Sequence, residues 1–95
     1  MSNELIQQLE QVKQFSIGQR VYVPDVKSIE LNTYDIEKID IVILCNNYAH
    51  ISLLFADKLG NICEQMKLED FNRRFFVDMQ AAYKALDMEE MNENE

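Results

Sequence analysis

The chain has 95 residues, 47% of them hydrophobic, and its 17 acidic and 9 basic side chains give a net charge of -8 at pH 7. A chain of this length fills one hydrophobic core, and it holds no run of about 18 apolar residues that could cross a bilayer. The acidic balance disfavours direct contact with nucleic acid or an anionic membrane, because such a surface repels a polyanion. We therefore expect a single soluble domain in the cytoplasm.

The first segment predicts an amphipathic N-terminal helix over residues 1–15. Ser2 can accept hydrogen bonds from the free N–H groups at the start of this helix. Leu5, Leu9 and Val12 recur at the spacing that places side chains on one helix face, and glutamines occupy many of the other positions. The helix is expected to lay this apolar stripe on the rest of the molecule.

A first strand is predicted over residues 19–23, where Val21 and Val23 alternate with other residues and face the core. The strand is expected to end at the only proline, which has no N–H to donate to a neighbouring strand. Residues 24–36 show no sustained hydrophobic period, which indicates a long loop in which Ile29 and Leu31 could form a short edge strand. Within that loop, residues 32–35 have the composition of a turn.

Residues 37–57 predict two adjacent strands that form the centre of the fold. On both arms the odd-numbered residues are apolar and share one face of the strand, which we expect to face the core. These residues are Ile39, Ile41, Ile43, Cys45, Ala49, Ile51, Leu53 and Phe55. Both sets can face inward only if the connecting loop has an odd number of residues. We expect residues 46–48 to form it, with an asparagine in the left-handed conformation, which places Ile41 opposite Leu53.

A tight turn is predicted over residues 57–60, with Gly60 in the left-handed conformation and Asn61 at the start of the next strand. This loop length pairs Phe55 with Ile62. In this strand and the residues that follow it, we expect three side chains to face the core: Ile62, Met66 and Leu68.

The C-terminal third predicts three further elements. A single helical turn is expected over residues 68–71, and a short final strand over residues 73–77. Asp78 is placed to cap a C-terminal helix over residues 78–91. The acid-rich residues 92–95 are expected to be a disordered tail.

Four or five short antiparallel strands between two helices predict an α+β fold, with a small bent antiparallel sheet or half-open barrel over residues 18–77 of a single domain, residues 1–91. Four features carry a resemblance: Phe15-Ser16-Ile17-Gly18-Gln19-Arg20-Val21-Tyr22-Val23-Pro24, the central hairpin, the Gly60 turn, and Phe75-Phe76 before an alanine-rich helix. With these features the chain resembles small SH3-like barrel proteins, many of which come from phages and prophages. The resemblance implies a binding module rather than a catalyst.

The outer face of the central hairpin is also apolar, because Val42, Leu44 and Leu54 occupy even positions. A solvated outer face would alternate more cleanly with polar residues. Either a helix of the same chain covers this face or a second molecule does, and a homodimer is one form of the second possibility.

The residues that could carry chemistry do not form a recognisable site. Cys45, His50 and Cys63 are the candidate soft metal ligands, and their spacing matches no common zinc pattern. The acids lie mainly on turns, helix ends and the tail, where a general acid–base pair is not expected. We therefore expect no metal, no cofactor and no enzymatic activity.

These observations favour a non-enzymatic protein-binding module that inhibits or adapts a host protein as a monomer or homodimer. We expect it to be encoded by a phage or mobile element. The acidic surface could mimic nucleic acid and bind a basic host surface, as anti-defence proteins, anti-CRISPR proteins or transcription inhibitors would. The residues expected to contact the partner are exposed aromatic and charged side chains: Tyr22, Tyr34, Asp35, Tyr48, Glu69, Asp70, Arg73 and Arg74. A small barrel that binds nucleic acid directly through Arg20, Lys67, Arg73 and Arg74 is the alternative, and a small enzyme or enzyme subunit is a third reading.

Overall fold

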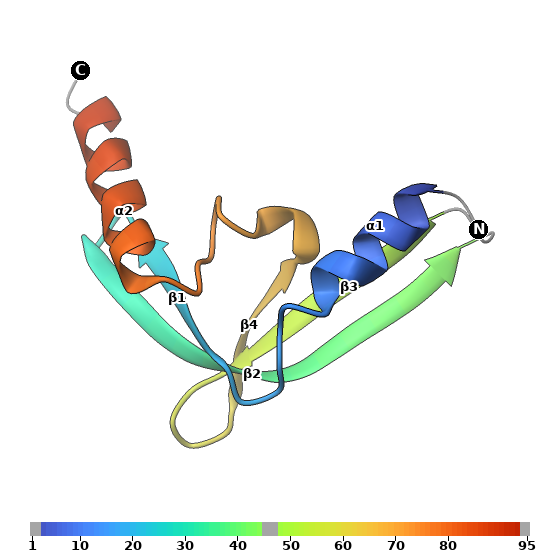
Figure 1. Cartoon of the computed structure of the whole chain (residues 1–95). Helices are drawn as coiled ribbons and strands as arrows, with labels where there is room; N and C mark the ends of the chain where they lie inside the picture. Colours follow the sequence, from blue (N-terminus) through green and yellow to red (C-terminus); the bar gives the residue numbers. More distant parts are fainter. Residues whose placement is uncertain (1–2, 45–47, 94–95) are drawn as a thin grey trace.

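The computed structural model of the chain describes residues 3–44 and 48–93, with side chains as far as Asp87. Figure 1 shows one four-stranded antiparallel sheet, with its strands in sequence order and a helix near each end of the chain. The elements are α1 (Asn3–Val12), β1 (Arg20–Asp25), β2 (Glu30–Leu44), β3 (Tyr48–Ala56), β4 (Ile62–Lys67), the 3-10 helix η1 (Leu68–Asp70) and α2 (Met79–Glu93). The predicted α+β class and small antiparallel sheet are confirmed.

The longest strand, β2, has 15 residues and belongs to both halves of the sheet. Its residues 30–35 pair with β1, and its residues 35–44 pair with β3. A bulge between Ile36 and Lys38 interrupts the second pairing, and bulges bend the strand that carries them. The sheet is accordingly V-shaped, with α2 beside one arm and α1 beside the other (Figure 1).

The long loop predicted over residues 24–36 is wrong. Residues 32–35 lie inside β2, and the chain reverses instead at residues 26–29. Pro24 continues β1 and lies opposite Leu31. An edge strand tolerates a proline, because the side of the strand without a neighbour needs no N–H donor.

The loop of the central hairpin has an odd number of residues, as predicted, but the predicted pairing register of its two strands is wrong. Ile41 lies opposite Ile51 rather than Leu53, and the last described pair before the loop is Leu44 with Tyr48. The connection is therefore residues 45–47, which lie outside the described part of the chain, as do the expected left-handed asparagine and the orientation of Cys45. A shift of two residues leaves every side chain on its predicted face, because strand side chains alternate with a period of two.

Only one arm of the hairpin is buried as predicted. The inward set on β3, from Ala49 to Phe55, is fully or almost fully buried. On β2, however, Ile41 and Ile43 are 43% and 50% exposed, so their predicted burial is wrong. The physical reason is the position of α1, which packs against β3 and leaves the end of β2 uncovered.

The turn after β3 is one residue longer than predicted. Gly60 has φ +84, in the left-handed region as expected. Phe55 pairs with Glu64 instead of Ile62, and Ile62 is exposed rather than buried. Met66 and Leu68 are buried as predicted.

The segment between β4 and α2 forms η1 as predicted, but the strand expected over residues 73–77 is wrong. Only Phe76 pairs with β1, exchanging two backbone hydrogen bonds of 2.8 and 2.9 Å with Tyr22. Asp78 caps α2 as predicted, because its Oδ1 accepts the N–H of Gln80 at 3.1 Å. The helix then runs to Glu93, beyond its predicted end at residue 91.

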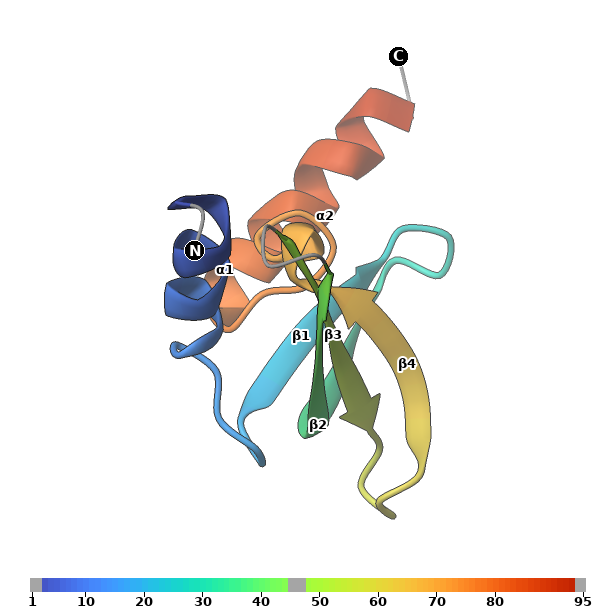
Figure 2. The same ribbon diagram turned by 90° about the vertical axis from the view of Figure 1, so that its right-hand side faces the viewer.

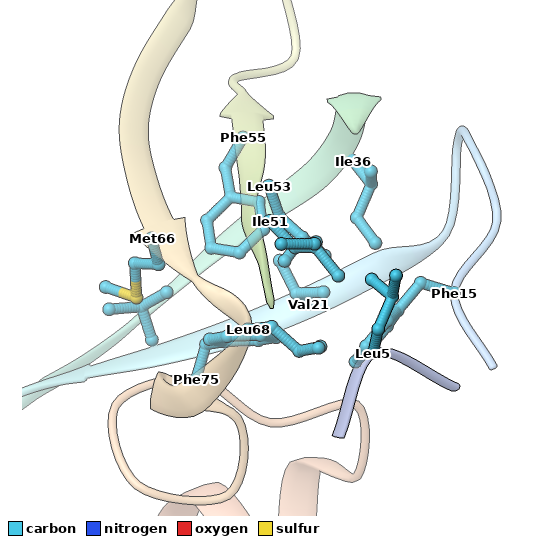
Figure 3. Packing of buried hydrophobic residues seen from close by; sticks show 12 residues of the cluster. Leu5, Phe15, Val21, Ile36, Ile51, Leu53, Phe55, Met66, Leu68 and Phe75 are labelled. Atoms are coloured by element: carbon cyan, nitrogen blue, oxygen red, sulfur yellow. The ribbon is translucent and has the colours of Figure 1, made fainter. Parts of the chain in front are cut away.

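The buried hydrophobic side chains of the sheet gather in one cluster with those of α1, η1 and the segments beside them (Figure 3). Phe55 and Phe75 are fully buried and meet edge to face, with ring centroids 5.2 Å apart. Phe15 extends this cluster from the segment after α1, 5.0 Å from the ring of Phe71. Helix α1 contributes Leu5, which is almost fully buried as predicted. Burial of each large side chain contributes about 1.5–3 kcal/mol to folding.

Candidate functional site

An open groove of about 510 Å³ lies between the β1–β2 turn, β4, the loop after η1 and α2. Its apolar lining includes Val23 and Met66, both buried members of the core, together with Pro24 and Val26. These side chains are held in place by the sheet, so the floor of the groove is preformed. In Figure 2, β1 and β4 lie at the two edges of the sheet, and residues of both strands line the groove.

Five charged side chains line the same groove. The basic ones are Arg73, Arg74 and Lys27, and the acidic ones are Asp25 and Glu64. The lining is therefore slightly basic in a chain whose net charge is -8. Guanidinium groups with this placement can donate paired hydrogen bonds to a carboxylate or a carbonyl of a bound segment.

Asp70 positions both arginines. Its carboxylate lies 3.7 Å from the Arg73 guanidinium and 3.7 Å from that of Arg74, and its carbonyl oxygen accepts the N–H of Arg74 at 2.7 Å. Its Oδ2 also accepts the N–H of Lys67 at 3.3 Å. The loop then turns through Asn72, whose φ of 63 is left-handed and well tolerated by asparagine. Asp70 thus orients the two arginines at the groove and is not itself free to bind.

Tyr34 and Asp35 lie at a second, smaller groove of about 160 Å³. The ring of Tyr34 is nearly parallel to that of Phe55, with centroids 6.2 Å apart. Burial raises the pKa of Tyr34 above its ordinary value, and the negative charges of Glu64 and Asp25 act in the same direction. Asp35 forms an ion pair of 3.5 Å with Arg20. Both side chains therefore have roles within this chain.

Tyr48 and Glu69 line neither of these grooves but contact each other. The Tyr48 hydroxyl donates a hydrogen bond to the Glu69 carboxylate at 3.5 Å. The ring of Tyr48 also meets His50 edge to face, with centroids 5.2 Å apart. Tyr22 is half-buried on β1, where its backbone pairs with Phe76.

The structure therefore divides the eight predicted contact residues among several places. It brings together Asp70, Arg73 and Arg74, and it adds Asp25 and Lys27, which sequence reasoning missed. The reason is that the turn was predicted over residues 32–35, so nothing in the sequence pattern placed residues 25–27 opposite the arginines.

Asp57, in the turn between β3 and β4, holds Cys63 in place. The Asp57 carboxylate accepts the N–H groups of Leu59 and Asn61 at 2.9 and 3.0 Å, and the Cys63 thiol donates to it at 3.5 Å. Desolvation and the Asp57 charge raise the pKa of the Cys63 thiol, which keeps it protonated. Within the described ranges, no group of three His, Cys, Asp or Glu side chains could hold a metal ion.

In the described part of the chain, neither helix covers Val42 and Leu44 on the even-numbered face of the hairpin. Val42 and Leu44 are 55% and 42% exposed, and Leu54 is half-buried. The expectation that a helix of the same chain covers this face is therefore wrong for the two β2 residues.

Comparison with known proteins finds no matching family model, no matching curated protein and no matching solved structure. In the part of the chain that the structure describes, neither helix has the length and apolar character needed to span a membrane.

Proposed function

We propose that this chain is a non-enzymatic protein-binding module that receives a segment of its partner in the groove beside Arg73 and Arg74. The observation that carries this proposal is the combination of an apolar floor, which includes Val23 and Met66, with charged side chains around it. Binding pockets usually combine preformed apolar surface with polar groups that orient the ligand, and this groove has both. Arginines at such a site also contribute strongly to binding energy.

The partner that we propose is a host protein with a basic, nucleic-acid-binding surface in the cytoplasm, and the role is that of an inhibitor or adaptor encoded by a phage or mobile element. The net charge of -8 supports this choice, because it accelerates association with a basic partner. Asp25 and Glu64, which also line the groove, can accept hydrogen bonds from lysine or arginine side chains of that partner. An interaction of this kind weakens as the salt concentration rises.

We also propose that the sheet is an SH3-like half-open barrel. In support, the chain passes from β4 through η1 and returns to β1, where Phe76 and Tyr22 exchange two backbone hydrogen bonds. That return partly closes the sheet, which reduces its free edges. The long bent β2 belongs to both halves of the sheet.

Affinity capture from a host lysate tests the proposed function with matched charge changes. The double variant Arg73→Ala with Arg74→Ala should reduce capture of the partner by at least about tenfold, because each arginine at an interface can contribute more than 1.4 kcal/mol. The control, Lys13→Ala with Lys58→Ala, removes the same charges at exposed sites away from this groove. Equal capture by both double variants, or no stoichiometric partner for the wild type, would contradict the proposal.

The alternative of direct nucleic-acid binding has one supporting observation, since Arg73, Arg74 and Lys27 line the same groove. Arg20 lines the second groove instead, and Lys67 lines neither. We therefore expect no retardation of single- or double-stranded oligonucleotides at low salt, where phosphate contacts are strongest. Retardation that the Arg73→Ala, Arg74→Ala variant abolishes would favour this alternative over the protein partner.

A further inference from the structure

The fold leaves part of one edge of β2 unpaired. Beyond residue 35, β2 has β3 on one side only. The start of that edge is covered by the segment before β1, because Ile36 donates its N–H to Gln19 at 2.9 Å and accepts the N–H of Gly18 at 2.7 Å. Among the residues that the structure describes, none pairs with the edge over residues 38–44.

The hydrogen bonds of Ala49 show which residues direct their backbone toward this edge. Both backbone groups of Ala49 bond to the side chain of Gln8, so they point away from β2. Its cross-strand partner Ile43 therefore points its N–H and C=O away from β3, because the two residues of an antiparallel pair share one bonding type. The same holds two and four residues earlier, at Ile41 and Ile39. The backbone donors and acceptors of these three isoleucines face the open edge.

Both faces of the same edge are apolar. Ile41 and Ile43 are exposed on one face, and Val42 and Leu44 are exposed on the other. A strand that is apolar on both faces is typical of the interior of a sheet. Edge strands normally carry charges, prolines or bulges that prevent further pairing, and residues 41–44 carry none of these.

We propose that residues 38–44 pair in antiparallel orientation with the same edge of a second copy of this chain. All three isoleucines whose backbone groups face this edge can pair if Ile41 lies opposite Ile41 of the second copy. Ile39 of each copy then lies opposite Ile43 of the other, and each such pair exchanges two hydrogen bonds. A two-fold axis through this contact joins both sheets into one, and it uses the same surface on both copies.

The charges on this edge fit a second copy. Two molecules that each carry a net charge of -8 can approach only where acidic groups are sparse, and residues 41–44 have no charged side chain. In the proposed register Lys38 lies opposite Leu44 of the second copy, and Asp40 lies opposite Val42, so no like charges face each other directly. Asp40 is also paired with Lys38 of its own chain at 3.4 Å.

The size of the contact indicates a reversible dimer. A stable interface involves about 20–30 residues a side, and an edge of this length supplies far fewer. The mass should therefore depend on protein concentration. This surface is separate from the proposed groove, which involves α2 on the other arm of the sheet (Figure 1), so either proposal can fail without the other.

Sedimentation equilibrium of the full chain from about 10 µM to about 1 mM tests the association. The wild-type mass should rise from 11.2 kDa toward twice that value. Val42→Asp should remain monomeric, because it places a second carboxylate directly opposite Asp40 of the other copy. Leu59→Asp, at a position that is 86% exposed in the turn after β3, should behave as the wild type. A wild type that stays monomeric throughout, or a Val42→Asp variant that associates equally well, overturns the proposal.

Amide hydrogen exchange tests whether the edge itself forms the contact. The N–H groups of Ile41 and Ile43 should exchange roughly tenfold or more slowly at the concentration where the dimer forms than in dilute solution. The N–H of Val42 points toward β3 and should be protected at both concentrations. A dimer in which Ile41 and Ile43 exchange as fast as in the monomer would overturn pairing through this edge.

Discussion

Gln8 bonds to Ala49 as a neighbouring strand would. Its side-chain amide donates to the Ala49 carbonyl at 2.7 Å, and its side-chain oxygen accepts the Ala49 N–H at 2.9 Å. The ladder between β3 and β4 ends at Ser52, so this edge of β3 would otherwise be open at Ala49. One glutamine therefore both satisfies the strand and attaches α1 to the sheet.

Replacement of Gln8 by alanine should lower the free energy of unfolding by about 1–3 kcal/mol, because it leaves a partly buried donor and acceptor of Ala49 without partners. Urea denaturation measures the change. Gln7→Ala removes the same group from an exposed position of α1 and should have little effect. Equal stability of the two variants would show that the Gln8 bonds contribute nothing net.

The stability of the turn after β3 should depend on pH through Asp57. Hydrogen bonds from the backbone N–H of Asn61, then of Leu59, lower the pKa of Asp57 below its ordinary value of 3.8. A carboxyl group with a lowered pKa in the folded state stabilises the protein above the unfolded pKa and loses that contribution as the pH falls through the folded pKa. Asp57→Asn should therefore be less stable than the wild type at pH 7, and the difference should shrink at low pH.

Urea denaturation at several values between pH 7 and pH 2 measures this convergence. Asp87→Asn removes the same charge from an exposed position on α2 and serves as the control. A difference between wild type and Asp57→Asn that stays constant down to pH 2 would argue against an ionised Asp57 as the source of the stability.

The Cys63 thiol should react slowly with alkylating reagents, although it is exposed. Desolvation and the neighbouring Asp57 raise its pKa, and only the thiolate is the nucleophile. In a Cys45→Ser background, iodoacetamide at pH 8 should modify the folded protein more slowly than the urea-unfolded protein. Adding Asp57→Asn should accelerate the reaction of the folded form. Identical rates in the folded and unfolded states would contradict the raised pKa.

A substitution at Ile29, in the turn between β1 and β2, should make the folded protein more stable. This residue has φ 54, and the left-handed region is strained for a β-branched side chain. Ile29→Asn should raise the free energy of unfolding by about 1 kcal/mol, because asparagine adopts this conformation readily. Ile17→Asn makes the same chemical change at an exposed residue without positive φ. Thermal unfolding compares the two, and a loss of stability in Ile29→Asn would refute the strain argument.

The aromatic core should depend strongly on Phe55, which is fully buried between Tyr34 and Phe75. Phe55→Ala should lower the free energy of unfolding by about 3–5 kcal/mol, since it leaves a cavity among rigid neighbours. That loss is a large part of the 5–15 kcal/mol typical of a folded domain. Leu59→Ala, at an exposed position, should stay within about 0.5 kcal/mol of the wild type. Urea denaturation that gives similar values for both variants would contradict this core assignment.

Sequence patterns predicted those parts of the fold that depend on neighbouring residues. Gly60 takes a left-handed turn, Asp78 caps α2, and the alternation from Ala49 to Phe55 is buried. The register of the hairpin was predicted only to within two residues, because a two-residue slip keeps every side chain on the same face. The sequence analysis predicted no groove and named only two of its lining residues, Arg73 and Arg74, as partner contacts, because residues 25–27 come from a turn that was predicted several residues too late.

What the sequence determined by itself was therefore local: the two helices, the strands of the central hairpin, the left-handed turn at Gly60, the helix cap at Asp78, and which residues share a face. The tertiary structure alone decided that Arg74 lies across a groove from Asp25, and that Ile41 remains exposed although Ile51 opposite it is buried. A periodic pattern indicates which residues share one face of a strand. It does not indicate which element covers that face, because that element is distant in sequence. Here α1 covers β3 and stops short of the end of β2, and no local signal in either strand encodes that boundary.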